Sequence, residues 1–167
     1  MLCHHFYFGV IALKDCFSDS FINNITMLDS VLRMSASYDL VGRDIFIGGK
    51  AARLYFIDGF CKDELMERVM AYLMKISKKD FAEKKTAREF ADAYIPYVET
   101  DVAGKPKDFI KYVLSGGIGI IVDGLTDGII VDARTYPVRS VQEPENDRVM
   151  QGARDGFVET LIFNTAL

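Results

Sequence analysis

The sequence predicts a mixed α/β (α+β) protein of two small α/β lobes, each with helices packed on a short sheet, followed by a C-terminal helical segment. Two glycine-containing turns, at residues 48–50 and 123–128, each join two short apolar runs and therefore predict two β-hairpins. Segments with helical periodicity surround each hairpin. Half of the 167 residues are hydrophobic, which is enough to fill one or two compact cores.

The expected organisation has four parts. An N-terminal segment covers residues 1–17, the first lobe 18–80 and the second lobe 81–142. A charged segment and a C-terminal helix then occupy residues 143–167.

In the first lobe, residues 18–35 carry apolar side chains at helical spacing, and serine and aspartate near the start can cap this helix. The opposite face is polar and includes Asn24. Strands are predicted at 39–47 and 51–57, on either side of the first glycine turn. A helix over 62–76 follows, with acidic residues in its first turn, where they suit the helix dipole.

The second lobe repeats this order. A short helix over 86–94 ends before a proline, and residues 97–102 are extended. Proline at the first position and glycines after the end favour a helix over 106–114. Strands at 118–122 and 129–133 form the second hairpin.

A basic stretch over 75–88 lies where the two lobes would join, and we interpret it as a connector. Two interpretations of its charge remain open: a solvated loop, or a patch that faces anionic lipid or a partner. Its basic side chains are Lys75, Lys78, Lys79, Lys84, Lys85 and Arg88.

The sequence offers little catalytic chemistry. Both histidines, His4 and His5, lie at the N-terminus, so no serine or cysteine has an evident base, and we predict that the chain is not an enzyme. The three cysteines are widely spaced, which favours reduced thiols over disulfides or a zinc site. We predict neither a cofactor nor a metal.

Other ligand classes are also disfavoured. Asp123, Asp127 and Asp132 surround one hairpin and could hold a hard cation, but Asp-Gly pairs are typical of tight turns. The net charge of −4 and the absence of tryptophan argue against nucleic acid. The longest apolar runs, 6–13 and 116–122, fall far short of the roughly 20 residues that a membrane helix needs.

The most unusual segment is 134–159, where arginines alternate with carboxylates. This region also carries two ordered motifs, Arg139-Ser140-Val141-Gln142-Glu143-Pro144 and Ala153-Arg154-Asp155-Gly156-Phe157-Val158-Glu159-Thr160. Together with residues 163–167 and 54–63, they resemble the GerA family of bacterial spore germination proteins, most like a stage V sporulation subgroup. The resemblance begins near residue 20 and leaves 1–17 unmatched.

The resemblance implies a cytoplasmic N-terminal domain, on the core side of the spore inner membrane, that precedes several transmembrane helices. Family members are thought to form oligomeric channels that release ions at germination. We therefore expect this chain to be the soluble domain, with the membrane region absent after residue 167. Its expected role is assembly and gating, with a homo-oligomer and other spore germination membrane proteins as partners.

Four charged residues carry the expected contacts. In an oligomer close to a membrane, Arg139, Glu143, Arg154 and Glu159 have a reason to pair between subunits or against the membrane-side core. An alternative function is a regulatory module that binds a small molecule in the cleft between the lobes. A third is a hydrolase, which would need the hairpin aspartates to converge on a metal.

Overall fold

The computed structural model describes residues 5–8, 11–61, 63–84, 86–95 and 99–134. These residues confirm the mixed α+β class. The elements in chain order are β1 (His5–Phe8), β2 (Ile11–Lys14), α1 (Phe21–Val31), β3 (Leu40–Ile47), β4 (Lys50–Ile57), α2 (Asp63–Leu73), α3 (Lys78–Ala82), α4 (Ala87–Tyr94), β5 (Thr100–Ala103), α5 (Pro106–Leu114), β6 (Ile118–Val122) and β7 (Gly128–Val131). The predicted C-terminal helix lies outside the described residues.

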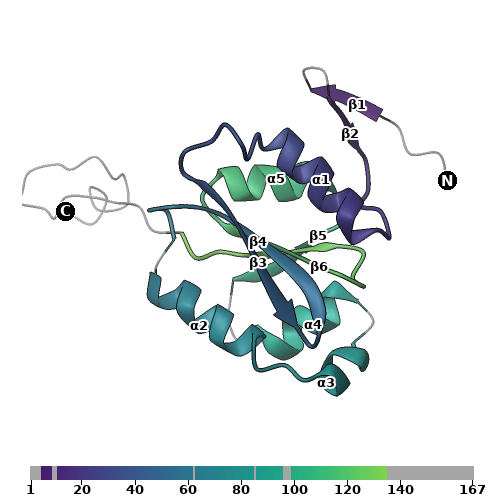
Figure 1. The fold of residues 1–167 in the computed structure, drawn as a ribbon, viewed down its shortest axis with the longest axis vertical. Helices are drawn as coiled ribbons and strands as arrows, with labels where there is room; N and C mark the ends of the chain where they lie inside the picture. The colour runs from purple at the N-terminus through teal and green to yellow at the C-terminus, as the bar shows by residue number, and fades with distance from the viewer. Residues whose placement is uncertain (1–4, 9–10, 62, 85, 96–98, 135–167) are drawn as a thin grey trace, which may run out of the picture. The chain divides into compact units, whose positions relative to one another are not determined.

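Five strands form one antiparallel sheet in the order β3-β4-β6-β7-β5, while β1 and β2 pair separately as a hairpin. Both predicted glycine-turn hairpins are confirmed, as β3–β4 and β6–β7. The two hairpins are joined through β4 and β6, where Leu54 lies opposite Ile120 (Figure 1).

This pairing corrects the prediction of two lobes with separate sheets. β4 belongs to the first predicted lobe and β6 to the second, yet they are neighbouring strands of one sheet. The alternative of a small-molecule site in a cleft between the lobes stays a prediction, although β4 and β6 are directly paired and leave no cleft between themselves. The reason is physical: each hairpin alone exposes an apolar edge strand, and pairing the two edges satisfies the backbone groups of both.

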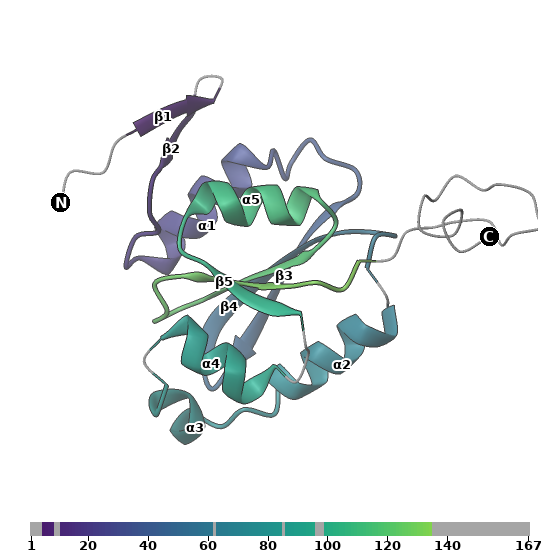
Figure 2. The same ribbon diagram turned by 180° about the vertical axis from the view of Figure 1, so that it is seen from behind.

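Helices cover both faces of the sheet. α1 and α5 lie on one face, and α2, α3 and α4 lie on the other (Figure 2). The alternation of side chains along β4 supplies both cores, because Leu54 faces α2 and α4 whereas Tyr55 faces α1 and α5. β6 is buried along its whole length, as expected for a central strand covered on both faces.

Close packing of α5 on the sheet depends on two glycines. A Cβ on Gly119 would lie 2.4 Å from Cζ of Phe109, and one on Gly128 would lie 2.5 Å from Cδ2 of the same ring. The fully buried Phe109 ring also packs edge-to-face against Phe17 and Tyr55. It is the centre of the core beneath α1 and α5.

α1 begins as predicted, with the Ser20 side chain accepting a hydrogen bond from the N–H of Asn23. The expectation that Asn24 lies on the polar face is wrong, since this residue is buried. Its amide donates to the carbonyl of Ser18 at 2.7 Å and accepts from the Ser18 N–H at 2.8 Å. Asn24 therefore fixes the loop that leads into the helix.

Candidate functional site

The four residues predicted to make subunit or membrane-side contacts, Arg139, Glu143, Arg154 and Glu159, lie outside the described residues. Their roles remain predictions. The basic stretch over 75–88 is described except for Lys85 and can be traced in space.

In the structure, the basic side chains of this stretch do not form one surface patch. Lys75 lines a hollow beside Tyr94, whereas Arg88 lines a different hollow beside β5. Arg88 also pairs with Asp101 at 2.8 Å and with Asp92 at 3.7 Å. Lys79 is exposed. Among the described residues of the stretch, Lys78 and Lys84 line one and the same surface hollow.

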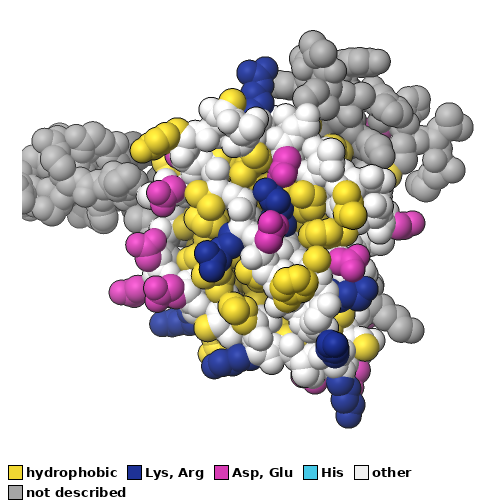
Figure 3. All heavy atoms as spheres, in the orientation of Figure 1, with side chains coloured by type: hydrophobic (Ala, Val, Ile, Leu, Met, Phe, Trp, Pro, Cys, Tyr) yellow, Lys and Arg dark blue, Asp and Glu magenta, His cyan; other side chains and the backbone are white. Residues whose placement is uncertain are grey.

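That hollow is lined by the β3–β4 turn, α3 and the turn after β6, and has a volume of about 630 Å³. We call it the lysine groove. Its lining consists of Gly48, Gly49, Lys50, Lys78, Phe81, Ala82, Lys84 and Gly124. Figure 3 shows several Lys and Arg side chains over the part of this face where α3 lies in Figure 1. Lys50, which the sequence placed only in a turn, thus joins two lysines that follow it by about thirty residues.

The glycine turn brings β3 and β4 close to α3. Gly48 and Gly49 have φ of 56° and 78°, the left-handed values that a two-residue hairpin turn requires. A Cβ on Gly48 would lie 2.5 Å from Cβ of Phe81, and one on Gly49 would lie 2.7 Å from Cε of Lys78. The aliphatic stem of Lys78 therefore lies against the turn, and the two turn glycines place no side chain of their own in the groove.

The position of α3 is fixed by a capping box at its start and by a hydrogen bond from a residue of α4. The Ser77 side chain accepts from the N–H of Asp80, and the Asp80 carboxylate accepts from the Ser77 N–H, which together form a capping box. The Ser77 hydroxyl also donates to the Asp80 carboxylate at 2.6 Å, and this bond, together with the one from the Ser77 N–H, holds the pKa of Asp80 below its usual value. The Tyr94 hydroxyl donates to the Asp80 carbonyl at 3.0 Å. This short helix corrects the prediction of a simple connector, because its Phe81 is buried in the core.

The charge of the groove is positive in a chain whose net charge is −4. Lys50 Nζ lies 3.2 Å from an Asp123 carboxylate oxygen. Within the described part of the chain, neither Lys78 nor Lys84 forms an ion pair. No carboxylate belongs to the lining, and among the described residues the ion pair between Lys50 and Asp123 is the only one that a groove lysine forms.

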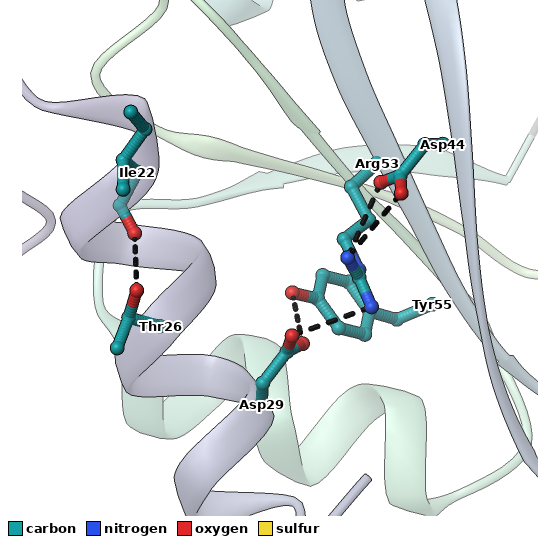
Figure 4. A network of polar contacts seen from close by, with 6 residues as sticks. All are labelled: Ile22, Thr26, Asp29, Asp44, Arg53 and Tyr55. Atoms are coloured by element: carbon teal, nitrogen blue, oxygen red, sulfur yellow. Dashed lines mark hydrogen bonds and ion pairs between the residues drawn. The ribbon is translucent and has the colours of Figure 1, made fainter.

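A second polar cluster lies on the opposite face of the sheet and joins α1 to β3 and β4 (Figure 4). The Arg53 guanidinium lies 3.3 Å from carboxylate oxygens of both Asp29 and Asp44. The Tyr55 hydroxyl donates to Asp29 at 2.9 Å. Burial and this hydrogen bond raise the pKa of Tyr55 far above its ordinary value. Apart from the buried Nε of Arg53, which has no hydrogen-bond partner among the described residues, these polar groups contact one another, so the cluster stabilises the packing of α1.

The other titratable groups with shifted pKa values in the described part of the chain lie apart from the lysine groove. Burial, together with the charge of Asp63 and Asp132, raises the pKa of the Cys61 thiol to about 11, which keeps it protonated at neutral pH. Hydrogen bonds from Arg134 hold the pKa of Asp132 below its usual value. Asp123 pairs with Lys50. Among the described residues, no three His, Cys, Asp or Glu side chains are placed to bind one metal ion.

The family of the chain follows from a match that covers most of its sequence. The sequence model described as Bacillus/Clostridium GerA spore germination protein matches residues 27–167. The chain belongs to the GerA family. The predicted resemblance is thereby confirmed, and the matched range includes both the lysine groove and the C-terminal charged motifs.

Individual relatives agree with this membership. Stage V sporulation protein AF of Bacillus subtilis (strain 168) is 33% identical over 141 residues, which cover 80% of this chain and 27% of that protein. Spore germination protein B1 of the same organism is 28% identical over 116 residues, covering 70% of this chain and 24% of that protein. The chain thus spans about a quarter of the length of these GerA relatives.

A solved structure shares the fold. The N-terminal domain of the A subunit of the Bacillus megaterium spore germinant receptor GerK3 superimposes with a TM-score of 0.54. It is 21% identical and the match covers 73% of this chain and 98% of that one. In the described part of this GerA chain, none of the helices has the length and apolar character needed to cross a bilayer.

Proposed function

We propose that this GerA chain is the N-terminal domain of a spore inner-membrane germination protein and lies on the core side of that membrane. Its role is non-enzymatic and concerns the assembly and gating of a complex that releases ions at germination. The family match over residues 27–167 carries the proposal. The fold shared with the N-terminal domain of a germinant receptor A subunit supports it.

The proposal includes specific partners. The full-length protein forms a homo-oligomer, contacts other spore germination membrane proteins and is anchored by a membrane region outside this chain. Nucleic acid is not a partner. A similarity to an uncharacterized membrane protein, YfkQ of Bacillus subtilis (strain 168), at 24% identity over 87% of this chain supports the membrane setting.

Within this proposal, the charged motifs after residue 134 supply subunit contacts. Arg139 and Arg154 offer guanidinium groups that can bind carboxylates in a bidentate manner. Glu143 and Glu159 supply carboxylates in the same segment. Pairing between copies would bury these charges with their partners, where a charge reversal costs far more than on a solvated surface.

The test uses the full-length gene in a spore-forming host that lacks it. We expect Arg139→Glu and Arg154→Glu to reduce the oligomer recovered from spore membranes and to slow cation release during germination. Arg68→Glu is the matched control, because Arg68 is exposed on α2 and forms no ion pair among the described residues. Unchanged assembly in both reversal variants would reject the proposed contacts, and unchanged cation release in the deleted strain would reject the role in germination.

A further inference from the structure

The lysine groove is more than a charged stretch of sequence. Its three ammonium groups come from the β3–β4 turn and from the segment around α3, which are brought together only by folding. Flexible surface lysines ordinarily spread apart to reduce their mutual repulsion. Here the turn glycines and the capped α3 fix the backbone positions of Lys50 and Lys78 around one hollow.

We propose that the lysine groove binds a phosphate group. Phosphate oxygens accept hydrogen bonds in a tetrahedral arrangement, and a lysine ammonium can approach each oxygen as a point charge. The groove is open, so it can take a phosphate that is still attached to a larger molecule. This inference does not depend on ion release and goes beyond the proposed function.

The residues that line the groove limit the class of ligand that it can bind. It contains no arginine and no carboxylate, so neither bidentate recognition of a carboxylate nor binding of a cation is favoured. Phe81, its one aromatic residue, is buried and packs against Phe90, which leaves no exposed ring for stacking on a nucleobase. The phosphate itself, and not an attached base, is therefore the recognised group.

Two sources can present such a phosphate: the headgroup of an anionic phospholipid, or a small phosphorylated solute. Both meet the same three lysines. They differ in that a bilayer surface presents many phosphates at once, which adds the attraction of the surface potential to the binding of each headgroup.

The first arm of the test measures flotation of the chain with phosphatidylglycerol vesicles and with neutral phosphatidylcholine vesicles. The groove variant is Lys50→Gln/Lys78→Gln/Lys84→Gln. The control, Lys75→Gln/Lys105→Gln/Lys111→Gln, removes the same charge from exposed positions outside the groove. At low salt we expect roughly a 100-fold loss of affinity for the anionic vesicles in the groove variant and less than about fivefold in the control.

The second arm titrates inorganic phosphate into the chain and follows the lysine side chains by NMR, with chloride at equal ionic strength as the reference. Saturable shifts at the groove lysines without vesicle binding identify a soluble phosphate as the ligand. Vesicle binding that needs the groove lysines identifies the lipid. Equal losses in the groove and control variants, or no binding of either probe by the wild type, overturn the proposal.

A variant that is expected to strengthen binding completes the test. Within the residues that the structure describes, Asp123 is the carboxylate that pairs with a groove lysine, at 3.2 Å from Lys50. Asp123→Asn removes that counter-charge and should strengthen phosphate or vesicle binding by a few-fold at low salt. Weaker binding in Asp123→Asn would contradict the electrostatic account.

Discussion

Two carboxylates contact the Arg53 guanidinium at the same distance but differ in their burial and in their other hydrogen-bond partners. Asp29 and Asp44 each have an oxygen 3.3 Å from Arg53. The Asp29 side chain is 30% exposed, whereas that of Asp44 is 73% exposed. Asp29 also accepts the hydroxyl hydrogen of Tyr55, whose residue is fully buried. We expect Asp29→Ala to destabilise the fold far more than Asp44→Ala.

The magnitudes follow from these contacts. Asp29→Ala removes a hydrogen bond to a charged acceptor, worth about 1.5–3 kcal/mol, and leaves the buried Tyr55 hydroxyl without its partner. The lost pairing with half-buried Arg53 adds to this cost, while the higher helix propensity of alanine in α1 offsets about 0.5 kcal/mol. The net loss is about 2–3 kcal/mol. Asp44→Ala breaks an exposed pair and should cost less than about 0.5 kcal/mol.

Urea denaturation of the chain measures both variants, and thermal unfolding provides a second measure. For a chain of this size we expect Asp29→Ala to lower Tm by roughly 6–9 °C and Asp44→Ala by about 1 °C. Tyr55→Phe, which removes only the hydroxyl, should fall between them at about 1 kcal/mol. Equal losses for the two aspartate variants would refute the reasoning, because distance to Arg53 and not burial would then determine the energy.

Three further predictions concern other parts of the fold. Gly119→Ala should cost about 2–3 kcal/mol in urea denaturation, because the new Cβ meets the Phe109 ring, and a loss below about 0.5 kcal/mol would show that α5 moves freely. The pKa of Cys61 is about 11, so with the other cysteines replaced by serine Cys61 should alkylate at pH 8 about 100-fold more slowly than an unperturbed thiol. For the same reason the unfolding free energy should fall as the pH rises from about 9 to 11. Because Arg134 lowers the pKa of Asp132, the unfolding free energy should fall on acidification through the carboxyl range. Asp132→Asn should flatten this pH dependence, and an unchanged slope of unfolding free energy against pH would contradict the prediction.

Local elements of the fold were predictable because their signals are local. The Gly48-Gly49 turn between alternating strands predicts a hairpin, and Pro106 with the later glycines brackets α5. The joining of two hairpins through Leu54 and Ile120 was not predictable, because strand pairing over a long separation leaves no periodic mark in either strand.

The candidate site was only half predictable for the same reason. Composition identifies Lys78 and Lys84 as part of a basic stretch, but Lys50 reaches them through the tertiary packing of the turn on Phe81. One local signal was available and missed: Ser77 followed three residues later by Asp80 is a capping-box pattern that indicates a helix inside the connector. The Arg53 cluster has no sequence signal, since its partners come from three elements.

The pairing of β4 with β6 also sets the order in which this domain can form during synthesis. Ala52 pairs with Val122, about 70 residues later in the chain. At the usual rate of about 5–20 residues per second, the ribosome exposes β4 for several seconds before its central neighbour exists. The β3–β4 hairpin must wait with one apolar edge uncovered, and the closure of so long a loop slows folding further. Association with a chaperone is therefore expected to be strongest on nascent chains that end between these two strands.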